Sequence, residues 1–261
     1  MEGAHRADEP RDRGASLSDP ASAWSGATYE RIAEAFAPIH HRIVETLDPR
    51  PGGRFLDLAC GTGGVALIAA RSGAAVTGLD ISADQLEKAR AAAEAESLDA
   101  RFDEGDVENL PYEDGEFDSV ASAFGIIFAA DHERAAHELT RVSGPGARFA
   151  ITTWQQDEWF QLGQRLRPDY SSMTAHLWAE EDHVRDLFPE ADLTFERGVS
   201  TIAAASTDEC WELLSSSVAP LKAWLEALGV DERADAEGEY KQLIEDGSLS
   251  REYILILGTP R

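Results

Sequence analysis

Apolar residues recur along the middle of this chain in short blocks, and their spacing alternates between that of strands and that of helices. The intervening segments carry apolar residues at helical spacing, with Ser82 (followed by Gln85) and Asp131 where helix N-caps are expected. Because strands that alternate with helices form a parallel sheet covered on both faces, the pattern predicts an α/β fold. The predicted strands are residues 54–60, 74–81, 100–107, 117–124 and 147–154.

The segment before the first strand has a different pattern. Residues 1–20 carry charged and turn-forming residues with almost no apolar ones, which predicts a flexible tail. Residues 21–50 should form an N-terminal helical cap, in which Pro38 predicts either two short helices or a kink. The apolar stripe of this cap, at spacings of three and four, consists of Tyr29, Ile32, Phe36, Ile39 and Ile43.

The strand–helix rhythm breaks after residue 154. Residues 155–192 are rich in aromatic side chains but show no strand pattern, so we interpret them as an insertion that caps the domain. A strand is predicted at 193–203, then a helix that starts at Ser206 and Glu209 and is interrupted by Pro220. An acidic helix at 231–245 precedes a last strand at 252–257, so residues 51–261 are predicted to form one domain with a cap insertion at 155–192.

One glycine-rich turn carries the clearest chemical signal. The segment Asp57-x-x-x-Gly61-x-Gly63 joins a predicted strand to a predicted helix, and Asp80 ends the next strand. Glycines let a ligand approach the backbone closely, and the helix start offers unpaired N–H groups. A dinucleotide site would need a third glycine, which is absent here, and would leave Asp57 unexplained. An NAD-type oxidoreductase is nevertheless kept as the alternative, because it also uses a glycine turn followed by an acid at the end of the next strand.

This turn resembles the first motif of the class I S-adenosylmethionine-dependent methyltransferases, and residues 117–122 resemble the fourth-strand motif of that family. The resemblance covers roughly residues 55–154 and includes small-molecule and ubiquinone–menaquinone methyltransferases. It implies a Rossmann-like seven-stranded sheet that is mostly parallel, with the last strand antiparallel, helices on both faces and a helical cap. It also implies S-adenosylmethionine as methyl donor and S-adenosylhomocysteine as product.

The resemblance also implies roles for particular residues. Asp57 would bind the amino end of the methionine part, and the carbonyl of Ala59 and the backbone of the glycine turn would also contact it. Asp80 would accept both ribose hydroxyls, since an ionised carboxylate has two oxygens. Asp106 would accept from the adenine amino group. The expected cofactor-binding set is Asp57, Ala59, Gly61, Thr62, Gly63, Asp80, Ile81, Asp106, Val107 and Ala123.

The acceptor side departs from one common version of the family. Ubiquinone- and menaquinone-type members place one or two histidines about ten residues after the acid of the fourth strand, where this chain has Ile127 and Phe128. The catalytic residue is therefore unassigned. Both the N-terminal cap and the 155–192 insertion are expected to enclose an apolar pocket for a small aromatic or apolar acceptor. Its candidate residues, for which core packing is the alternative, are Tyr29, His40, Phe124, Phe128, Trp154 and Trp178.

Composition narrows the possible partners. Forty-nine acidic against 23 basic residues give a net charge of −26, which disfavours nucleic acid and anionic membranes. Two cysteines and the absence of long apolar runs or a secretory signal favour the cytoplasm. No His, Asp or Glu cluster has metal-ligand spacing, so we expect activity without added divalent metal. A non-catalytic cofactor-binding protein is a further alternative, and the oligomeric state and the methylated atom stay open.

Overall fold

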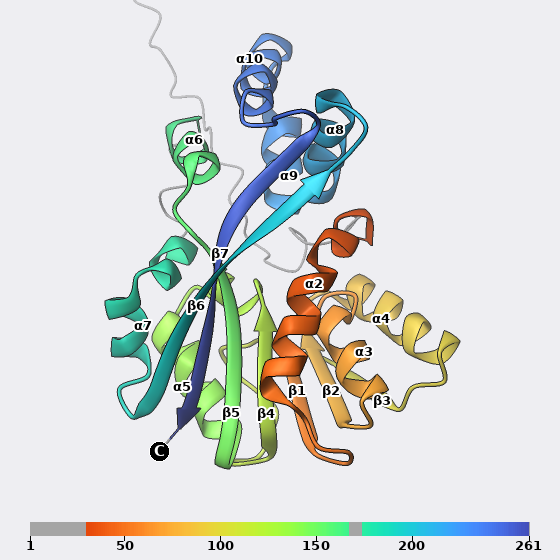
Figure 1. The fold of residues 1–261 in the computed structure, drawn as a ribbon, viewed down its shortest axis with the longest axis vertical. Coiled ribbons are helices and arrows are strands. Elements are labelled where there is room, and N and C mark those ends of the chain that lie inside the picture. The colour runs from red at the N-terminus through yellow and green to blue at the C-terminus, as the bar shows by residue number, and fades with distance from the viewer. Residues whose placement is uncertain (1–29, 167–173, 261) are drawn as a thin grey trace, which may run out of the picture.

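A seven-stranded sheet forms the centre of the computed structural model, which describes residues 30–166 and 174–260 (Figure 1). Strands β1 to β5 pair in parallel, whereas β7 is antiparallel to both of its neighbours, β5 and β6. This confirms the predicted Rossmann-like, mostly parallel sheet with an antiparallel last strand. In order across the sheet, the strands are β3 (Ala100–Glu104), β2 (Ala75–Asp80), β1 (Arg54–Leu58), β4 (Phe117–Ala123), β5 (Ser143–Trp154), β7 (Ser248–Pro260) and β6 (Ala191–Ala203).

Two apolar clusters cover the two faces of the sheet, because alternate side chains of a strand point in opposite directions. Phe55 of β1 belongs to one cluster and its neighbour Leu56 to the other. The first cluster includes buried residues of α2 (Glu30–Leu47), α3 (Gly64–Arg71) and α4 (Ala83–Ala95). The second includes buried residues of η1 (Ile126–Phe128), α5 (His132–Val142), η3 (Thr174–Ala179) and α7 (Glu181–Leu187).

Helix α2 passes through Pro38 as a single helix, which excludes the two short helices but leaves the predicted kink as a prediction. The side chain of Pro38 is exposed, so the hydrogen bond lost there lies on the solvent side. The opposite face buries Ile32, Phe36 and Ile43 almost completely. Burial of several large apolar side chains outweighs the cost of one missing backbone hydrogen bond. Tyr29 and the predicted tail lie outside the described residues.

A layer of helices stands beyond the carboxyl ends of the strands, and the long strands β6 and β7 reach up to it (Figure 1). It contains α6 (Glu158–Leu166), α8 (Thr207–Ser217), α9 (Ala219–Ala227) and α10 (Val230–Lys241). Tyr240 holds the layer together: its ring lies 4.5 Å from that of Trp159 and 5.6 Å from that of Trp211. The 155–192 segment is thus divided, since α6 joins this layer whereas η3 and α7 pack on the flank of the sheet.

Local signals placed several helix ends correctly. Asp131 accepts a hydrogen bond from the backbone of α5, and Ser206 accepts one from Glu209 at the start of α8. Helices α8 and α9 are separated at Val218, and Pro220 follows in the first turn of α9. The cap expected from Ser82 makes no side-chain bond to α4; its own backbone N–H donates to Asp80 instead.

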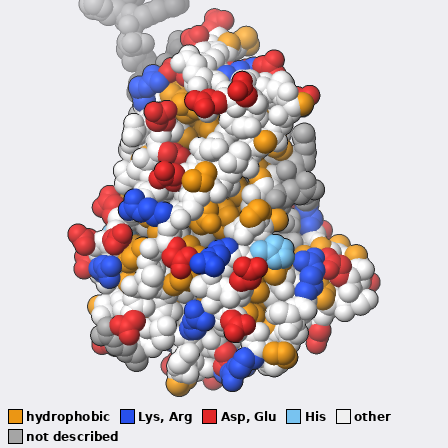
Figure 2. Space-filling model, viewed as in Figure 1, with side chains coloured by type: hydrophobic (Ala, Val, Ile, Leu, Met, Phe, Trp, Pro, Cys, Tyr) orange, Lys and Arg blue, Asp and Glu red, His pale blue; other side chains and the backbone are white. Residues whose placement is uncertain are grey.

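Acidic side chains are spread over the visible face among fewer basic ones, rather than gathered in one patch (Figure 2). Exposed ion pairs such as Arg42 with Glu196 lie between them. Within the described residues, none of the helices has the length and apolar character needed to cross a membrane.

A buried ion pair fastens the loop between β3 and β4 to helix α5. Glu138 is 3% exposed and accepts from the Leu110 backbone N–H at 2.8 Å, while its carboxylate also pairs with Arg141. Arg141 in turn donates to the carbonyl oxygens of Leu110 and Tyr112. These bonds lower the pKa of Glu138 to about 2, with the Arg141 hydrogen bond as the largest cause.

We predict that Glu138→Gln lowers the free energy of unfolding by about 1–3 kcal/mol, because Arg141 and the loop backbone lose a charged acceptor. A depressed pKa stabilises the fold above the ordinary value of 4.5 and loses that contribution as pH falls toward about 2. Urea denaturation should therefore show a smaller loss of stability between those pH values in the variant than in the wild type. Glu133→Gln, on the exposed side of the same helix, is the control; an equal effect would contradict the assignment.

His40 joins α2 to the start of α3. A Cβ built on Gly64 would lie 2.5 Å from two atoms of the His40 imidazole, so the ring occupies the space that the glycine leaves. His40 is 8% exposed, and burial, followed by the charge of His41, lowers its pKa to about 4. The ring is therefore uncharged at neutral pH and packs as a core residue.

We predict that Gly64→Ala destabilises the wild type by about 1–3 kcal/mol through overpacking. In a His40→Ala background the same substitution should cost much less, because the ring that it would hit is gone. Urea denaturation of the four proteins in this double-mutant cycle measures the coupling. Equal costs of Gly64→Ala in the two backgrounds would show that the two residues are not in contact.

Candidate functional site

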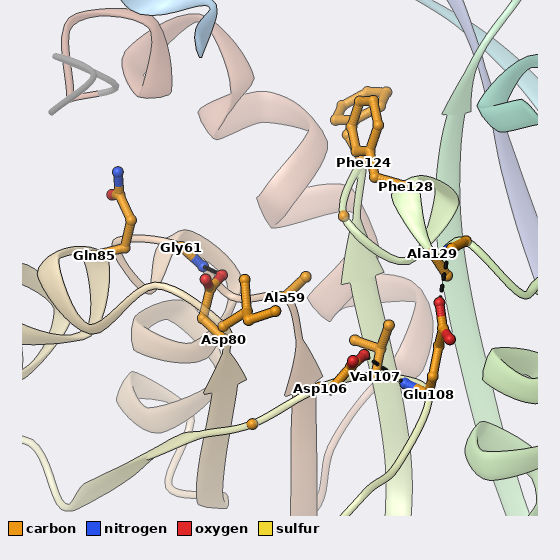
Figure 3. A pocket seen from close by; sticks show the side chains of 14 residues that line it. Ala59, Gly61, Asp80, Gln85, Asp106, Val107, Glu108, Phe124, Phe128 and Ala129 are labelled. Atoms are coloured by element: carbon orange, nitrogen blue, oxygen red, sulfur yellow. Dashed lines mark hydrogen bonds between the residues drawn. The ribbon is translucent and has the colours of Figure 1, made fainter. Parts of the chain in front are cut away.

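A cavity of about 300 Å³ opens at the carboxyl ends of β1, β2 and β4, beside the point where the strand order reverses (Figure 3). Ligands of open α/β sheets bind at such points. The turns that follow these strands, and the loop after β3, supply its walls. Its lining residues are Ala59, Gly61, Asp80, Ile81, Gln85, Gly105, Asp106, Val107, Glu108, Phe124, Gly125, Phe128, Ala129 and Ala130.

The two glycines of the first turn have different tasks. Gly61 has φ of 53°, and a Cβ there would meet nothing within 4 Å, so its open side leaves room for a ligand. Gly63 has φ of 85°, and a Cβ there would press on Ala89 at 3.3 Å and on the ring of Phe102. Gly63 therefore serves helix packing; neither it nor Thr62 is among the lining residues.

Asp57 lies behind the turn. It is 1% exposed, and its carboxylate accepts from the backbone N–H of Ala66 at 2.9 Å, in the first turn of α3. Burial raises the pKa of Asp57 to about 8, with repulsion from Asp80 adding to the effect and the Ala66 hydrogen bond opposing it. Asp57 does not line the cavity directly; through Ala66 it holds the first turn of α3, which follows the glycine turn.

Asp80 faces the cavity and ties two of its walls together (Figure 3). One carboxylate oxygen accepts from the Gly61 backbone N–H at 2.7 Å, and the other accepts from that of Ser82 at 2.9 Å. Burial raises its pKa. Each oxygen has a further lone pair, so a ligand hydroxyl can still donate to either one.

The loop after β3 forms the opposite wall. Asp106 accepts from the backbone N–H of Glu108 at 2.9 Å, which shapes the turn that presents Val107 to the cavity. Glu108 reaches across and accepts from the N–H groups of Ala130 and Asp131, at 2.6 and 3.0 Å. Glu108 thus joins this loop to the start of α5, a role that no local pattern in the sequence indicates.

The turn after β4 brings an aromatic ring to the cavity. Phe124 has φ of 57°, a left-handed conformation that is costly for a non-glycine residue. Its N–H donates to the Thr152 hydroxyl, and its ring stacks on that of Trp154 at 4.1 Å and 10°. The guanidinium of Arg251 lies 4.5 Å from the Trp154 ring, and Asp157 holds Arg251 with two hydrogen bonds.

The structure brings together most, but not all, of the predicted cofactor residues. Four of them are not among the lining residues: Asp57, Thr62, Gly63 and Ala123. Six further lining residues were not predicted from the sequence: Gln85, Gly105, Glu108, Gly125, Ala129 and Ala130. Those in the cavity lining are Ala59, Gly61, Asp80, Ile81, Asp106 and Val107.

The predicted acceptor residues are more scattered. Phe124 and Phe128 line the cavity, and Phe128 and Trp154 line a second, smaller one. His40 packs on Gly64 instead. Trp178 is fully buried beside Phe188 in the core under η3, which corrects its expected place in the pocket. Tyr29 lies outside the described residues. No group of three or more His, Cys, Asp or Glu placed to hold a metal occurs within residues 30–166 and 174–260.

Comparison with known proteins agrees with this geometry. A family model described as a methyltransferase domain matches residues 56–151. An uncharacterised protein of Mycobacterium tuberculosis is 34% identical over 207 residues, which cover 76% of each chain. Demethylmenaquinone methyltransferase of Thermus thermophilus is 47% identical over 112 residues, which cover 42% of this chain and 51% of that protein. The crystal structure of the YcgJ protein of Bacillus subtilis shares the fold, with a TM-score of 0.63 at 20% identity, covering 85% of this chain and 97% of that one.

The matched domain spans the strands and turns that build the cavity, from β1 into β5. A glycine turn with open space at Gly61 and a carboxylate at the end of β2 is the arrangement that the sequence motif predicted. The oxidoreductase alternative therefore loses its support. The chain belongs to the class I S-adenosylmethionine-dependent methyltransferases, and S-adenosylmethionine is its methyl donor.

Proposed function

We propose that this methyltransferase acts on a small, apolar or aromatic metabolite. The observation that supports the proposal is the pair of aromatic rings, Phe124 and Phe128, that line the cavity beside the strand ends. Pockets for small ligands are lined mostly by apolar and aromatic side chains. The helices α6 and α8–α10 stand beyond the same edge of the sheet (Figure 1). A net charge of −26 disfavours a nucleic-acid acceptor.

The cavity fits the methyl donor on two counts. Gly61 leaves open space where any other residue would place a Cβ, and Asp80 faces that space with lone pairs that its backbone bonds leave unused. We assign Asp80 to the ribose hydroxyls and Val107 and Ile81 to the faces of the adenine. Asp106 would accept from the adenine amino group, and Asp57 would act on the amino end of the methionine part through the turn.

When bound, S-adenosylmethionine supplies a methyl group that its sulfonium already activates. The chain then has to hold an acceptor in line with that methyl group and to exclude water. Phe124, clamped between its backbone bond to Thr152 and its stack on Trp154, forms a rigid apolar wall for this purpose. Histidine is absent from the described residues that line the larger cavity, so we propose catalysis by positioning rather than by a base at that wall.

The proposal includes the elements that cover the cavity. We propose that the N-terminal cap (21–50) and part of the 155–192 insertion close over the site, together with α8–α10. A contact of α2 supports this proposal: the Phe36 ring lies 5.5 Å from that of Phe124 and 5.7 Å from that of Trp154.

We also propose a cytoplasmic location. The cysteines Cys60 and Cys210 are both unpaired and buried, which agrees with a reducing cytoplasm.

We predict that Asp80→Ala weakens binding of S-adenosylhomocysteine by about 1–3 kcal/mol, the scale of hydrogen bonds to a charged acceptor. Asp106→Ala should cost less, because water can replace one bond at an exposed side chain. Calorimetric titration measures both, and ligand-free thermal unfolding checks that the variants fold. Asp84→Ala, an exposed acid in the first turn of α4, is the control. A change of less than about twofold for Asp80→Ala would overturn the ribose assignment.

A second prediction concerns protons. The pKa of Asp57 is about 8, so its carboxyl group is mostly protonated at pH 7 in the free enzyme. An ammonium group nearby favours the ionised form, and S-adenosylhomocysteine carries one whereas adenosine does not. Binding of S-adenosylhomocysteine at pH 7 should therefore release part of a proton, and its calorimetric enthalpy should differ between phosphate and Tris buffers. Adenosine binding and the Asp57→Asn variant should show little difference; the same buffer dependence in all three would refute the role of Asp57.

A further inference from the structure

A second cavity, of about 40 Å³, lies behind Phe128, and that ring lines both cavities. The walls of the smaller one come from η1, β5, α6, η3 and β7, which are far apart in the sequence. Its volume is close to the share of space that one water molecule takes in the liquid. It can therefore hold the tip of a ligand, such as one oxygen with its first carbon, whose remainder lies along Phe128.

Thr153 lines this cavity and carries a buried polar group. Its side chain is fully buried, and within the described part of the chain its hydroxyl has no hydrogen-bond partner. The neighbouring Thr152 differs, since its hydroxyl accepts from the backbone of Phe124. Across the sheet, Thr153 faces Ile254, which offers no polar side-chain atom. A buried hydroxyl left unpaired is costly, so a partner that enters through the cavity would bind favourably.

Arg251 adds donors to the same cavity without adding net charge. Its Nε and Nη2 atoms donate to Asp157 at 2.7 and 3.0 Å, and the side chains of the two residues are 14% and 21% exposed. Among the described residues, its Nη1 atom makes no hydrogen bond. Asp157 balances the charge of Arg251, so the remaining N–H groups suit an uncharged oxygen better than an anion.

We propose that this cavity is the subsite for the uncharged oxygen end, a hydroxyl or a carbonyl, of the methyl acceptor. Thr153 and Arg251 hydrogen-bond that oxygen, while the apolar body of the acceptor lies on Phe128 and Phe160. The subsite rests on the proposed function, because Phe128 also lines the cavity assigned to the methyl donor. An anionic acceptor is disfavoured by the Asp157 partner and by the net charge of −26.

Fluorine NMR with three probes tests the subsite: 4-fluorophenol, 4-fluorotoluene and 4-fluorobenzoate, each with and without saturating S-adenosylhomocysteine. We expect 4-fluorophenol to bind at least about tenfold more tightly than 4-fluorotoluene, the scale of one buried hydrogen bond. Thr153→Val removes the hydroxyl at nearly constant volume and should reduce that preference to under about threefold. Thr153→Ser should keep it. Thr46→Val, which removes another buried, unpartnered hydroxyl that lines neither cavity, is the matched control.

Each of the other outcomes contradicts one part of the proposed subsite or of the proposed function. Equal binding of the phenol and the toluene, or an unchanged preference in Thr153→Val, would mean that the hydroxyl is satisfied by an ordered water only. Tightest binding of the benzoate would make the subsite an anion site. If thermal unfolding shows that Thr153→Val is not folded, the comparison of Thr153→Ala with Thr153→Ser gives the same test. If the wild type does not bind S-adenosylhomocysteine but still prefers the phenol, the proposed function is refuted while the oxygen-binding subsite is retained.

Discussion

The site depends on the close approach of two turns, those that follow β1 and β4. A Cβ on Gly125 would lie 2.4 Å from the Cβ of Ala59, so the second turn can pass the first only with glycine at that position. Ala59 and Phe124 both have positive φ, at 51° and 57°, which costs on the order of 1 kcal/mol or more each. The Ser122 hydroxyl offsets part of this cost, because it donates to the carbonyl of Leu58 at 2.8 Å and accepts from the N–H of Ile126 at 2.9 Å. Both strained residues line the cavity at the point where the strand order reverses.

Carboxyl groups surround that opening, and they repel one another where they are ionised. Asp57 and Asp80 are both buried, and the charge of Asp80 helps to raise the pKa of Asp57. Glu108 and Asp106 stand on the opposite wall. A ligand with net positive charge relieves this repulsion, whereas an anion increases it. Because a sulfonium and an ammonium outweigh one carboxylate in S-adenosylmethionine, the electrostatics of the walls favour the methyl donor independently of shape.

The core of the fold could be predicted from the sequence because its signals are local. A strand such as β1 is buried at four of five positions, and its apolar run ends at the glycine turn. Burial, however, does not say which neighbour a side chain meets. His40 and Trp178 were expected near the ligand on their residue type, yet one fills the space beside Gly64 and the other the core under η3. The contact of Glu108 with Ala130 joins segments 22 residues apart, and no local spacing encodes it.

The two halves of the site differ in the same way, because one rests on local sequence signals and the other on contacts between distant segments. The donor half is built from the turns at the ends of consecutive strands, so a short motif is enough to define it. The proposed acceptor half combines η1, the end of β5, α6, η3 and β7, where Trp154 connects Phe124 to Arg251. Substitutions in these distant segments can reshape the smaller cavity while the Asp80 to Gly61 bond and the turns around it stay as they are. Acceptor choice can therefore change without loss of the methyl donor, which explains why the residues that define the family say little about the molecule that is methylated.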